Sequence, residues 1–335
     1  MDFLKDIINE IGDDYSKIAS EIDETETYID TGSYVFNALV SGTINGGFSG
    51  NRITAIAGES STGKTFFSLA VLKNFLCTYP DSYCLYFDTE AAINRSLLQS
   101  RGIDCSRVAV VNVVTIEEFR SKALKAVDMY LKKPVDERKP CMFILDSLGM
   151  LSTEKEITDA LNDKQVRDMT KSQLVKGAFR MLTLKLGQAD IPLIVTNHTY
   201  DVIGAYVPTK EMGGGSGLKY AASTIIHLSK KKEKDGTEVV GNIIKAKAVK
   251  SRLSKENREV EVRLYYDERG LDRYYGLLEL GEMGGLWKNV AGRYEIDGKK
   301  VYAKAILKDP EQYFTPEVMQ QLDAAAKQIF SYGTN

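Results

Sequence analysis

The chain has 335 residues, and 44 Lys and Arg against 46 Asp and Glu give a formal charge of −2 at pH 7. Hydrophobic residues make up 43% of the sequence and charged residues 27%, which excludes a mostly disordered chain and leaves room for about two domains. This balance also excludes a uniformly basic protein that coats nucleic acid, so any contact with DNA or RNA must come from a local basic surface.

The cysteines and the apolar runs indicate the cellular compartment. No run of eighteen apolar residues exists and the N-terminus lacks a basic signal region, so we expect no membrane segment and a cytoplasmic location. We also expect reduced thiols and no zinc site, because no cysteine lies in a Cys-x-x-Cys pair or at metal-ligand spacing from a histidine. The four cysteines are Cys77, Cys84, Cys105 and Cys141.

Residues 1–30 form an acidic N-terminal segment with ten Asp and Glu against two Lys. Apolar residues recur in it at helical spacing: Phe3, Leu4, Ile7, Ile8 and Ile11. This pattern predicts a short amphipathic helix followed by a polar linker, which together form an arm. The arm either caps its own body or contacts a neighbouring subunit, and the sequence does not decide between the two.

From residue 31 to about residue 270, apolar strands alternate with helices. Alternation of this kind predicts an α/β core with a mainly parallel sheet, and short continuous apolar runs are typical of strands covered on both faces. The predicted strands are Ile53–Ala57, Cys84–Asp88, Val108–Val113, Cys141–Asp146 and Leu193–Asn197, and the predicted helices are Lys64–Leu76, Thr115–Leu131 and Leu161–Leu186.

The last part of this core changes character. Three consecutive strands, Thr224–Leu228, Asn242–Val249 and Val260–Tyr266, are separated by turns, which predicts an antiparallel extension of the sheet. Residues 230–263 hold eleven Lys and Arg against six Asp and Glu, so a basic surface is expected here. Residues 271–335 are predicted to form a small C-terminal appendage with a helix near Pro316–Phe330.

The strongest motif lies between the first predicted strand and the helix that follows it. It matches G-x-x-x-x-G-K-[ST], a loop that wraps a phosphate chain with backbone N–H groups at a helix N-terminus. In this pattern Lys64 places its charge at the β- and γ-phosphates and the Thr65 hydroxyl binds Mg²⁺. We therefore expect ATP and Mg²⁺ as ligands. The loop residues are Gly58, Glu59, Ser60, Ser61, Thr62, Gly63, Lys64 and Thr65.

Three polar residues at other strand ends complete the predicted nucleotide site, because such ends share one edge of a parallel sheet. Asp146 ends an apolar strand, where a second magnesium carboxylate is expected, although such an Asp can also cap a helix. Glu90 follows Asp88 and can activate the attacking water, or can simply open the next helix. His198 can contact the γ-phosphate, or can pack at a strand end.

A glycine-rich loop, Tyr200–Gly217, follows His198 directly. Its aromatic and basic residues Tyr200, Tyr206 and Lys210 suit contact with the bases and backbone of single-stranded DNA. A shorter polar loop, Ser152–Asp159, follows the Asp146 strand. Composition alone leaves open that both are only mobile surface loops.

Together these residues resemble the RecA-type recombinases, and most closely the phage UvsX recombinases, over nearly the whole chain. The matching pieces are Gly58–Thr65, Asp88-Thr-Glu90, Leu145-Asp-Ser-Leu, Asn197-His-Thr-Tyr, Met212-Gly-Gly-Gly-Ser-Gly and Val249-Lys-Ser-Arg. The combination is far more specific than the phosphate-binding loop alone. The resemblance implies a RecA-like P-loop ATPase core that forms a helical filament on single-stranded DNA, with ATP held between neighbouring subunits.

The resemblance also implies roles for single residues. Glu90 would activate water and His198 would sense the γ-phosphate. Lys250 and Arg252 would reach the neighbour's ATP as cations supplied in trans. The two loops would bind DNA, the second one with Gly213, Gly214 and Gly215. Leu97 stands where bacterial relatives stack an aromatic ring on adenine, so base selectivity is left open.

We therefore expect a DNA-dependent ATPase that exchanges strands between single-stranded DNA and a homologous duplex in recombination, repair and recombination-dependent replication. Single-strand-binding and loader proteins are expected helpers. Two alternatives remain at this point. A hexameric replicative helicase uses a related core, although no N-terminal primase-binding domain is evident. A non-catalytic recombination mediator is the other, against which Lys64, Glu90 and Asp146 argue.

Overall fold

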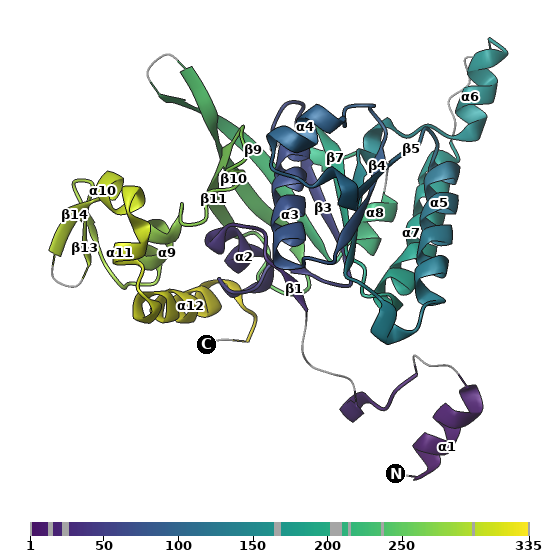
Figure 1. Cartoon of the computed structure of the whole chain (residues 1–335), viewed down its shortest axis with the longest axis horizontal. Coiled ribbons are helices and arrows are strands. Elements are labelled where there is room, and N and C mark those ends of the chain that lie inside the picture. Colours follow the sequence, from purple (N-terminus) through teal and green to yellow (C-terminus); the bar gives the residue numbers. More distant parts are fainter. Residues whose placement is uncertain are drawn as a thin grey trace.

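The computed structural model describes residues 2–12, 16–21, 27–163, 169–201, 210–213, 216–235, 238–296 and 299–333. At its centre lies a sheet with strand order β11-β10-β9-β3-β7-β6-β4-β5, to which β8 adds by pairing with β7 (Figure 1). The parallel strands are β3 (Ile53–Gly58), β4 (Tyr83–Asp88), β5 (Val108–Asn112), β6 (Cys141–Asp146), β7 (Leu193–Asp201) and β9 (Thr224–Asp235). The antiparallel strands are β8 (Lys210–Met212), β10 (Glu238–Ser251) and β11 (Glu259–Tyr265).

Helices cover both faces of this sheet, so its central strands are continuously apolar. All six residues of β3 and of β6 are buried. Successive side chains of β6 point to opposite faces, where Ile144 joins one hydrophobic cluster and Leu145 the other. The helices of the core are α3 (Lys64–Thr78), α4 (Arg95–Ser100), α5 (Ile116–Leu131), α6 (Glu154–Leu161), α7 (Lys171–Gln188) and α8 (Ser216–Ala221), with short 3₁₀ turns η2 (Cys105–Arg107), η3 (Val135–Glu137) and η4 (Leu148–Met150).

This architecture confirms the predicted α/β core with a mainly parallel sheet and an antiparallel extension. Two expectations around α6 were wrong. The segment Ser152–Asp159 is mostly helical rather than a loop, because the Thr153 side chain caps α6 and the Glu156 side chain bonds back to the Thr153 backbone. The helix expected from Leu161 begins only at Lys171, as α7.

The N-terminal segment contains α1 (Asp2–Ile11) and the 3₁₀ turn η1 (Ala19–Glu21), and it hangs away from the body (Figure 1). The body begins with β1 (Tyr28–Ile29), which pairs with β2 (Phe48–Ser49), and with α2 (Tyr34–Ser41) between them. In the described part of the chain no helix is long and apolar enough to cross a membrane. The cytoplasmic location itself stays a prediction.

The C-terminal residues pack against the core from the side of α2 and β11. Trp287, Ile306 and Leu322 join the hydrophobic cluster that also contains α2 and α3 residues. Asp323 accepts a hydrogen bond from the backbone N–H of Ile44 at 3.0 Å. The elements are α9 (Leu277–Met283), β12 (Asn289–Val290), β13 (Arg293–Ile296), β14 (Lys299–Tyr302), α10 (Ala303–Lys308), α11 (Pro310–Tyr313) and α12 (Pro316–Phe330). The division at residues 30 and 270 stays a prediction.

Candidate active site

The phosphate-binding motif lies between β3 and α3, as its spacing predicts. Gly63 caps α3 in the left-handed region at φ +90°, which favours glycine. A Cβ atom on Gly58 would lie 2.7 Å from the Leu228 carbonyl oxygen, so only glycine fits beside β9. The loop therefore turns tightly into the N-terminus of α3, where free N–H groups attract an anion.

Lys64 is buried beneath this loop. Its Nζ donates hydrogen bonds to the carbonyl oxygens of Gly58, at 3.0 Å, and Glu59, at 2.8 Å. Burial lowers the pKa of Lys64 below 10.5, while the charges of Asp146 and Glu90 oppose this shift. The ammonium group is thus held at the loop without full contact with water. A bound phosphate would give it a partner of opposite charge.

Asp146 and Thr65 lie together at the foot of the loop. The Thr65 hydroxyl donates to Asp146 Oδ2 at 2.7 Å. A hydroxyl and a carboxylate are the oxygen ligands that Mg²⁺ prefers, and this ion usually binds one or two such groups together with nucleotide phosphates. Among the described residues no group of three or more His, Cys, Asp or Glu could hold a metal by itself. The donor set therefore fits Mg²⁺ that arrives with a nucleotide.

Glu90 lies beside Asp146, just beyond the end of β4. The Ser147 hydroxyl donates to Glu90 Oε1 at 3.0 Å. Behind it, the Asp88 carboxylate accepts backbone N–H bonds from Glu90, at 3.0 Å, and Ile93, at 3.0 Å. Asp88 therefore shapes the turn that presents Glu90, a role that the sequence did not suggest.

His198 lies in β7, paired in register with Gly58 of the neighbouring β3. Its Nε2 is 3.8 Å from Glu90 Oε1, so the two side chains lie near each other. The His198 carbonyl accepts the N–H of Gly213 at 3.0 Å, and the Asn197 side chain donates to the Gly213 carbonyl at 2.8 Å. Two hydrogen bonds thus join this part of β7 to Gly213 of the glycine-rich loop.

The structure describes only the two ends of that loop. Tyr200 is exposed and lies in β7, and Lys210 is exposed and lies in β8, which pairs with β7. The first residues of the expected loop therefore belong to β7, and Lys210–Met212 form β8. Ser216 begins α8. Tyr206, Gly214 and Gly215 lie outside the described residues, so their predicted role is untested.

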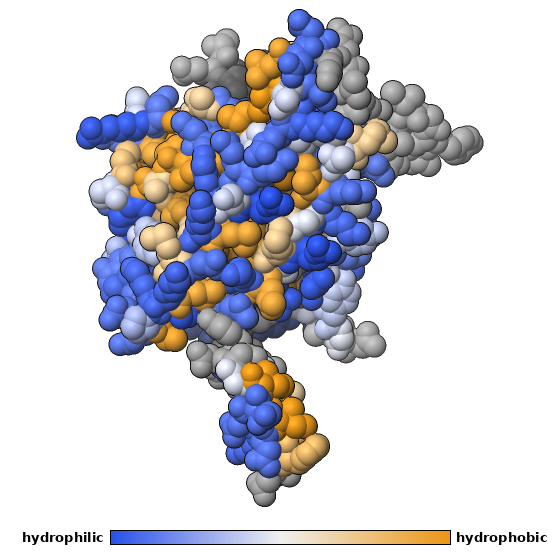
Figure 2. Space-filling view, turned by 90° about the vertical axis from the view of Figure 1, so that its right-hand side faces the viewer, coloured by the Kyte–Doolittle hydropathy of each residue, from blue (hydrophilic) through white to orange (hydrophobic). Residues whose placement is uncertain are grey.

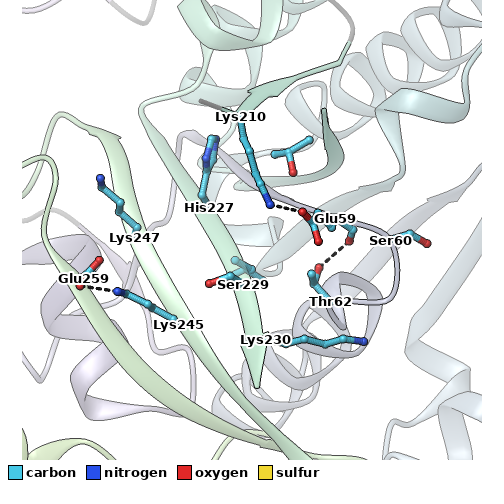
Figure 3. A pocket seen from close by; sticks show the side chains of 12 residues that line it. Glu59, Ser60, Thr62, Lys210, His227, Ser229, Lys230, Lys245, Lys247 and Glu259 are labelled. Atoms are coloured by element: carbon cyan, nitrogen blue, oxygen red, sulfur yellow. Dashed lines mark hydrogen bonds and ion pairs between the residues drawn. The ribbon is translucent and has the colours of Figure 1, made fainter. Parts of the chain in front are cut away.

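A basic pocket of about 430 Å³ lies beside the phosphate-binding loop (Figure 3). Lys210 forms an ion pair with Glu59, and Lys245 forms one with Glu259 at 2.7 Å. Thr199 also lines the pocket, and its buried hydroxyl has no partner within the described residues. Of the lining lysines only Lys210 was named from the sequence, although the basic stretch 230–263 was noted. The basic lining residues are Lys210, Lys230, Lys245 and Lys247, and His227 lies among them with a pKa that burial lowers.

Lys250 and Arg252 lie far from their own phosphate-binding loop. Lys250 pairs with Ile225 on β9, three residues before Leu228, which pairs with Gly58, so the separation is about 10 Å along the strand. Lys250 Nζ donates to carbonyl oxygens at the end of α8, among them that of Ala222 at 2.7 Å, while Arg252 is exposed. Lys250 thus lies beside the first residues of β9, whereas the loop lies beside its middle.

Leu97 is half-buried in α4 and, like Ile93, packs against the hydrophobic core.

The site as a whole combines a strand, a phosphate-binding loop and a helix with two carboxylates. Asp146 is of the kind that binds magnesium, and Glu90 lies just beyond the end of the neighbouring strand β4. These features define a P-loop nucleoside triphosphatase.

Comparison with known proteins narrows this class. The family described as the RecA N-terminal domain matches residues 2–272. The recombination and repair protein of Enterobacteria phage T4 is 34% identical over 280 residues, which cover 83% of this chain and 68% of the phage protein. RecA of Desulforapulum autotrophicum is 28% identical over 287 residues, 84% of this chain and 78% of that protein. RecA of a Nocardioides species is 26% identical over 285 residues, 83% and 76%.

The chain therefore belongs to the RecA family of recombinases, as its motifs predict. The higher identity to the phage protein than to these two bacterial proteins agrees with the resemblance to phage recombinases. Members of this family are DNA-dependent ATPases that act in homologous recombination and repair.

Proposed function

We propose that this chain is an ATP-dependent recombinase that forms a helical filament on single-stranded DNA and exchanges strands with a homologous duplex. The observation that carries the proposal is the convergence of one nucleotide crevice with a loop of DNA-binding composition. Glu90 and His198 border the crevice, and the His198 backbone bonds directly to Gly213 at the end of that loop. Family membership supports the same conclusion.

In this proposal the residues of the crevice divide the work of hydrolysis. The loop Gly58–Thr65 binds the phosphates, and Lys64 neutralises charge at the β- and γ-phosphates. Glu90 orients and deprotonates the attacking water, with its own position held by Ser147 and the Asp88 turn. Thr65 and Asp146 would hold Mg²⁺, which neutralises charge on the phosphates when bound.

DNA binding is proposed to involve the segment after β7. Tyr200 and Lys210 would contact bases and backbone, together with Tyr206 and residues 213–215. The lysine-lined pocket of Figure 3 lies beside this segment, and its charge suits the phosphates of a polynucleotide. His198 links the two functions, because loss of the γ-phosphate would free its ring while its backbone still holds Gly213.

Filament formation is proposed to place Lys250 and Arg252 against the ATP of the neighbouring subunit. Lys250 lies about 10 Å along the strand from the register of its own phosphate-binding loop, and Arg252 is exposed. The arm supplies a second contact. The apolar side of α1 is exposed, with Phe3 at 74% and Leu4 at 54%. Figure 2 shows this side of α1 and also apolar side chains on the face that bears α5 and α7. Met129 of α5 and Leu184 of α7 are exposed.

The direct test is homologous pairing with purified protein. We expect ATP hydrolysis to rise when single-stranded DNA is added, and we expect joint molecules between that DNA and a homologous duplex. A heterologous duplex is the control and should give none. ATP-driven unwinding without pairing would favour a helicase, and DNA binding without phosphate release would favour a mediator.

A further inference from the structure

The Asp146 carboxylate accepts hydrogen bonds from three hydroxyl groups, of which the phosphate-binding motif accounts for only one. Thr65 donates to Oδ2 at 2.7 Å, and the Tyr86 phenol donates to the same oxygen at 2.6 Å. Thr196 donates to Oδ1. The side chains of Tyr86 and Thr196 are fully buried, so each was placed inside the core with a polar group that needs a partner.

The sheet brings these donors to Asp146 from both sides. Asp146 ends β6, which lies between β4 and β7. Tyr86 on β4 pairs with Ile144, two residues before Asp146 and on the same face, so the long phenol side chain reaches along the strand to the carboxylate. On β7, Val195 pairs with Leu145 of β6. Thr196 is the next residue of β7 and therefore lies beside Asp146 of β6.

Thr65 differs from the other two donors because its hydroxyl has a second task. In the proposed function its oxygen also coordinates the magnesium ion that accompanies ATP, through a lone pair that the hydrogen bond to Asp146 leaves unused. The Tyr86 phenol and the Thr196 hydroxyl have no such second task and serve to fix the buried Asp146 carboxylate. Burial and the nearby Asp146 charge raise the pKa of Tyr86 well above 10, so its phenol stays protonated at neutral pH.

On the basis of the proposed function, we propose that Tyr86 and Thr196 are positioning residues for Mg-ATP binding. They hold the Asp146 carboxylate in one orientation, so that it and the Thr65 oxygen face the ion together. Without the Tyr86 phenol, Thr65 would be the remaining described side-chain donor to Oδ2, and the carboxylate would be held less firmly toward the ion.

The effect should appear in nucleotide binding that depends on magnesium. We would measure the affinity of the nucleotide-free protein for a fluorescent ATP analogue in the absence of DNA, once with Mg²⁺ and once with EDTA. In Tyr86→Phe the affinity with Mg²⁺ should fall about tenfold, the size expected for one hydrogen bond to a charged group. The affinity with EDTA should stay within twofold, since Lys64 and the loop bind the phosphates without Asp146.

Matched variants separate positioning from a loss of structure. Thr196→Val should act in the same direction as Tyr86→Phe, and Thr196→Ser, which keeps a hydroxyl, should restore the wild-type ratio of the two affinities. Tyr83→Phe is the control, because Tyr83 is half-buried at the start of β4, beside Cys141 and away from Asp146. Circular dichroism and thermal melting without nucleotide would establish that each variant is folded.

An unchanged ratio of the two affinities in both Tyr86→Phe and Thr196→Val would overturn the proposal. So would an equal loss of affinity with Mg²⁺ and with EDTA, because that pattern reports damage to the phosphate-binding loop. Failure of the proposed function looks different. In that case the wild-type protein itself would bind the analogue no more tightly with Mg²⁺ than with EDTA.

Discussion

The two ends of the parallel strands carry polar residues of different kinds. At the carboxyl end, His198 Nε2 lies 3.8 Å from Glu90 Oε1, and the Glu90 charge acts on Lys64. At the other end, Lys250 bonds only to carbonyl oxygens at the end of α8, and Arg252 is exposed. If, as proposed, Lys250 and Arg252 reach the nucleotide of a neighbouring chain, the two ends act on different nucleotides and ATP turnover depends on assembly.

The largest expected effect tests the carboxyl end. Glu90→Gln should lower DNA-stimulated phosphate release about a thousandfold, because the amide cannot accept the proton of the attacking water. ATP binding should remain, since Lys64 and the loop are intact. Phosphate release and analogue binding measure the two quantities. Turnover within tenfold of the wild type would remove Glu90 from the mechanism.

A smaller effect is expected from the residue behind Glu90. Asp88→Asn replaces one of the two carboxylate oxygens that accept the N–H groups of Glu90 and Ile93. We expect kcat to fall about thirtyfold while ATP affinity stays the same, because hydrogen bonds to a charged acceptor shape the turn. Asp81→Asn, at an exposed site before β4, is the control. Equal kcat in both variants would contradict the positioning role of Asp88.

The arm offers a test of assembly that leaves both sheet ends unchanged. Leu4→Ser on the exposed apolar side of α1 should raise the protein concentration needed to form filaments on DNA by about tenfold, as expected if this side chain becomes buried against a neighbour. Glu10→Gln, on the same helix, is the control. Electron microscopy of filaments across a concentration series measures the change. If filaments form equally well, the exposed apolar side of α1 has no role in assembly.

The smallest effect concerns pH. Burial lowers the pKa of Lys64 below 10.5, so its charge is present at neutral pH and is lost as the pH rises through that lowered value. ATP binding needs the charge, and affinity should therefore begin to fall at a lower pH than for a lysine of ordinary pKa. Lys64→Met should bind weakly and without this pH dependence. An affinity that is constant up to pH 10.5 would show that the Lys64 pKa is not lowered.

Much of the core could be predicted from the sequence, because its signals are local. The run Cys141–Asp146 coincides with β6, and Pro316–Phe330 coincides with α12. The strand β9 extends well past the predicted Leu228, because its charged outer part has no apolar signal and is formed by pairing with β10. Helix α6 was missed although Thr153 and Glu156 carry a capping signature that is visible in the sequence.

The site residues also divide into those with a local sequence signal and those without one. The phosphate-binding loop carries its own context, a strand before it and a helix after it, and so it was found directly. Ser147 and Tyr86 were not found as site residues, because their contacts join segments that are neighbours in the sheet but not in the chain. Only the strand order β7-β6-β4 brings them to Glu90 and Asp146. Asp88 was missed although its contacts with Glu90 and Ile93 are local.

Mixing two inactive variants tests most directly whether residues from two chains together form each site of ATP hydrolysis. Glu90→Gln keeps Lys250, and Lys250→Ala keeps Glu90, so in a mixed filament some seams combine an intact Glu90 with an intact Lys250. We predict that each variant alone shows little DNA-stimulated ATP hydrolysis, and that an equal mixture recovers about a quarter of wild-type activity, the share of such seams in a heterologous assembly. A mixture no more active than the variants measured separately would contradict the account.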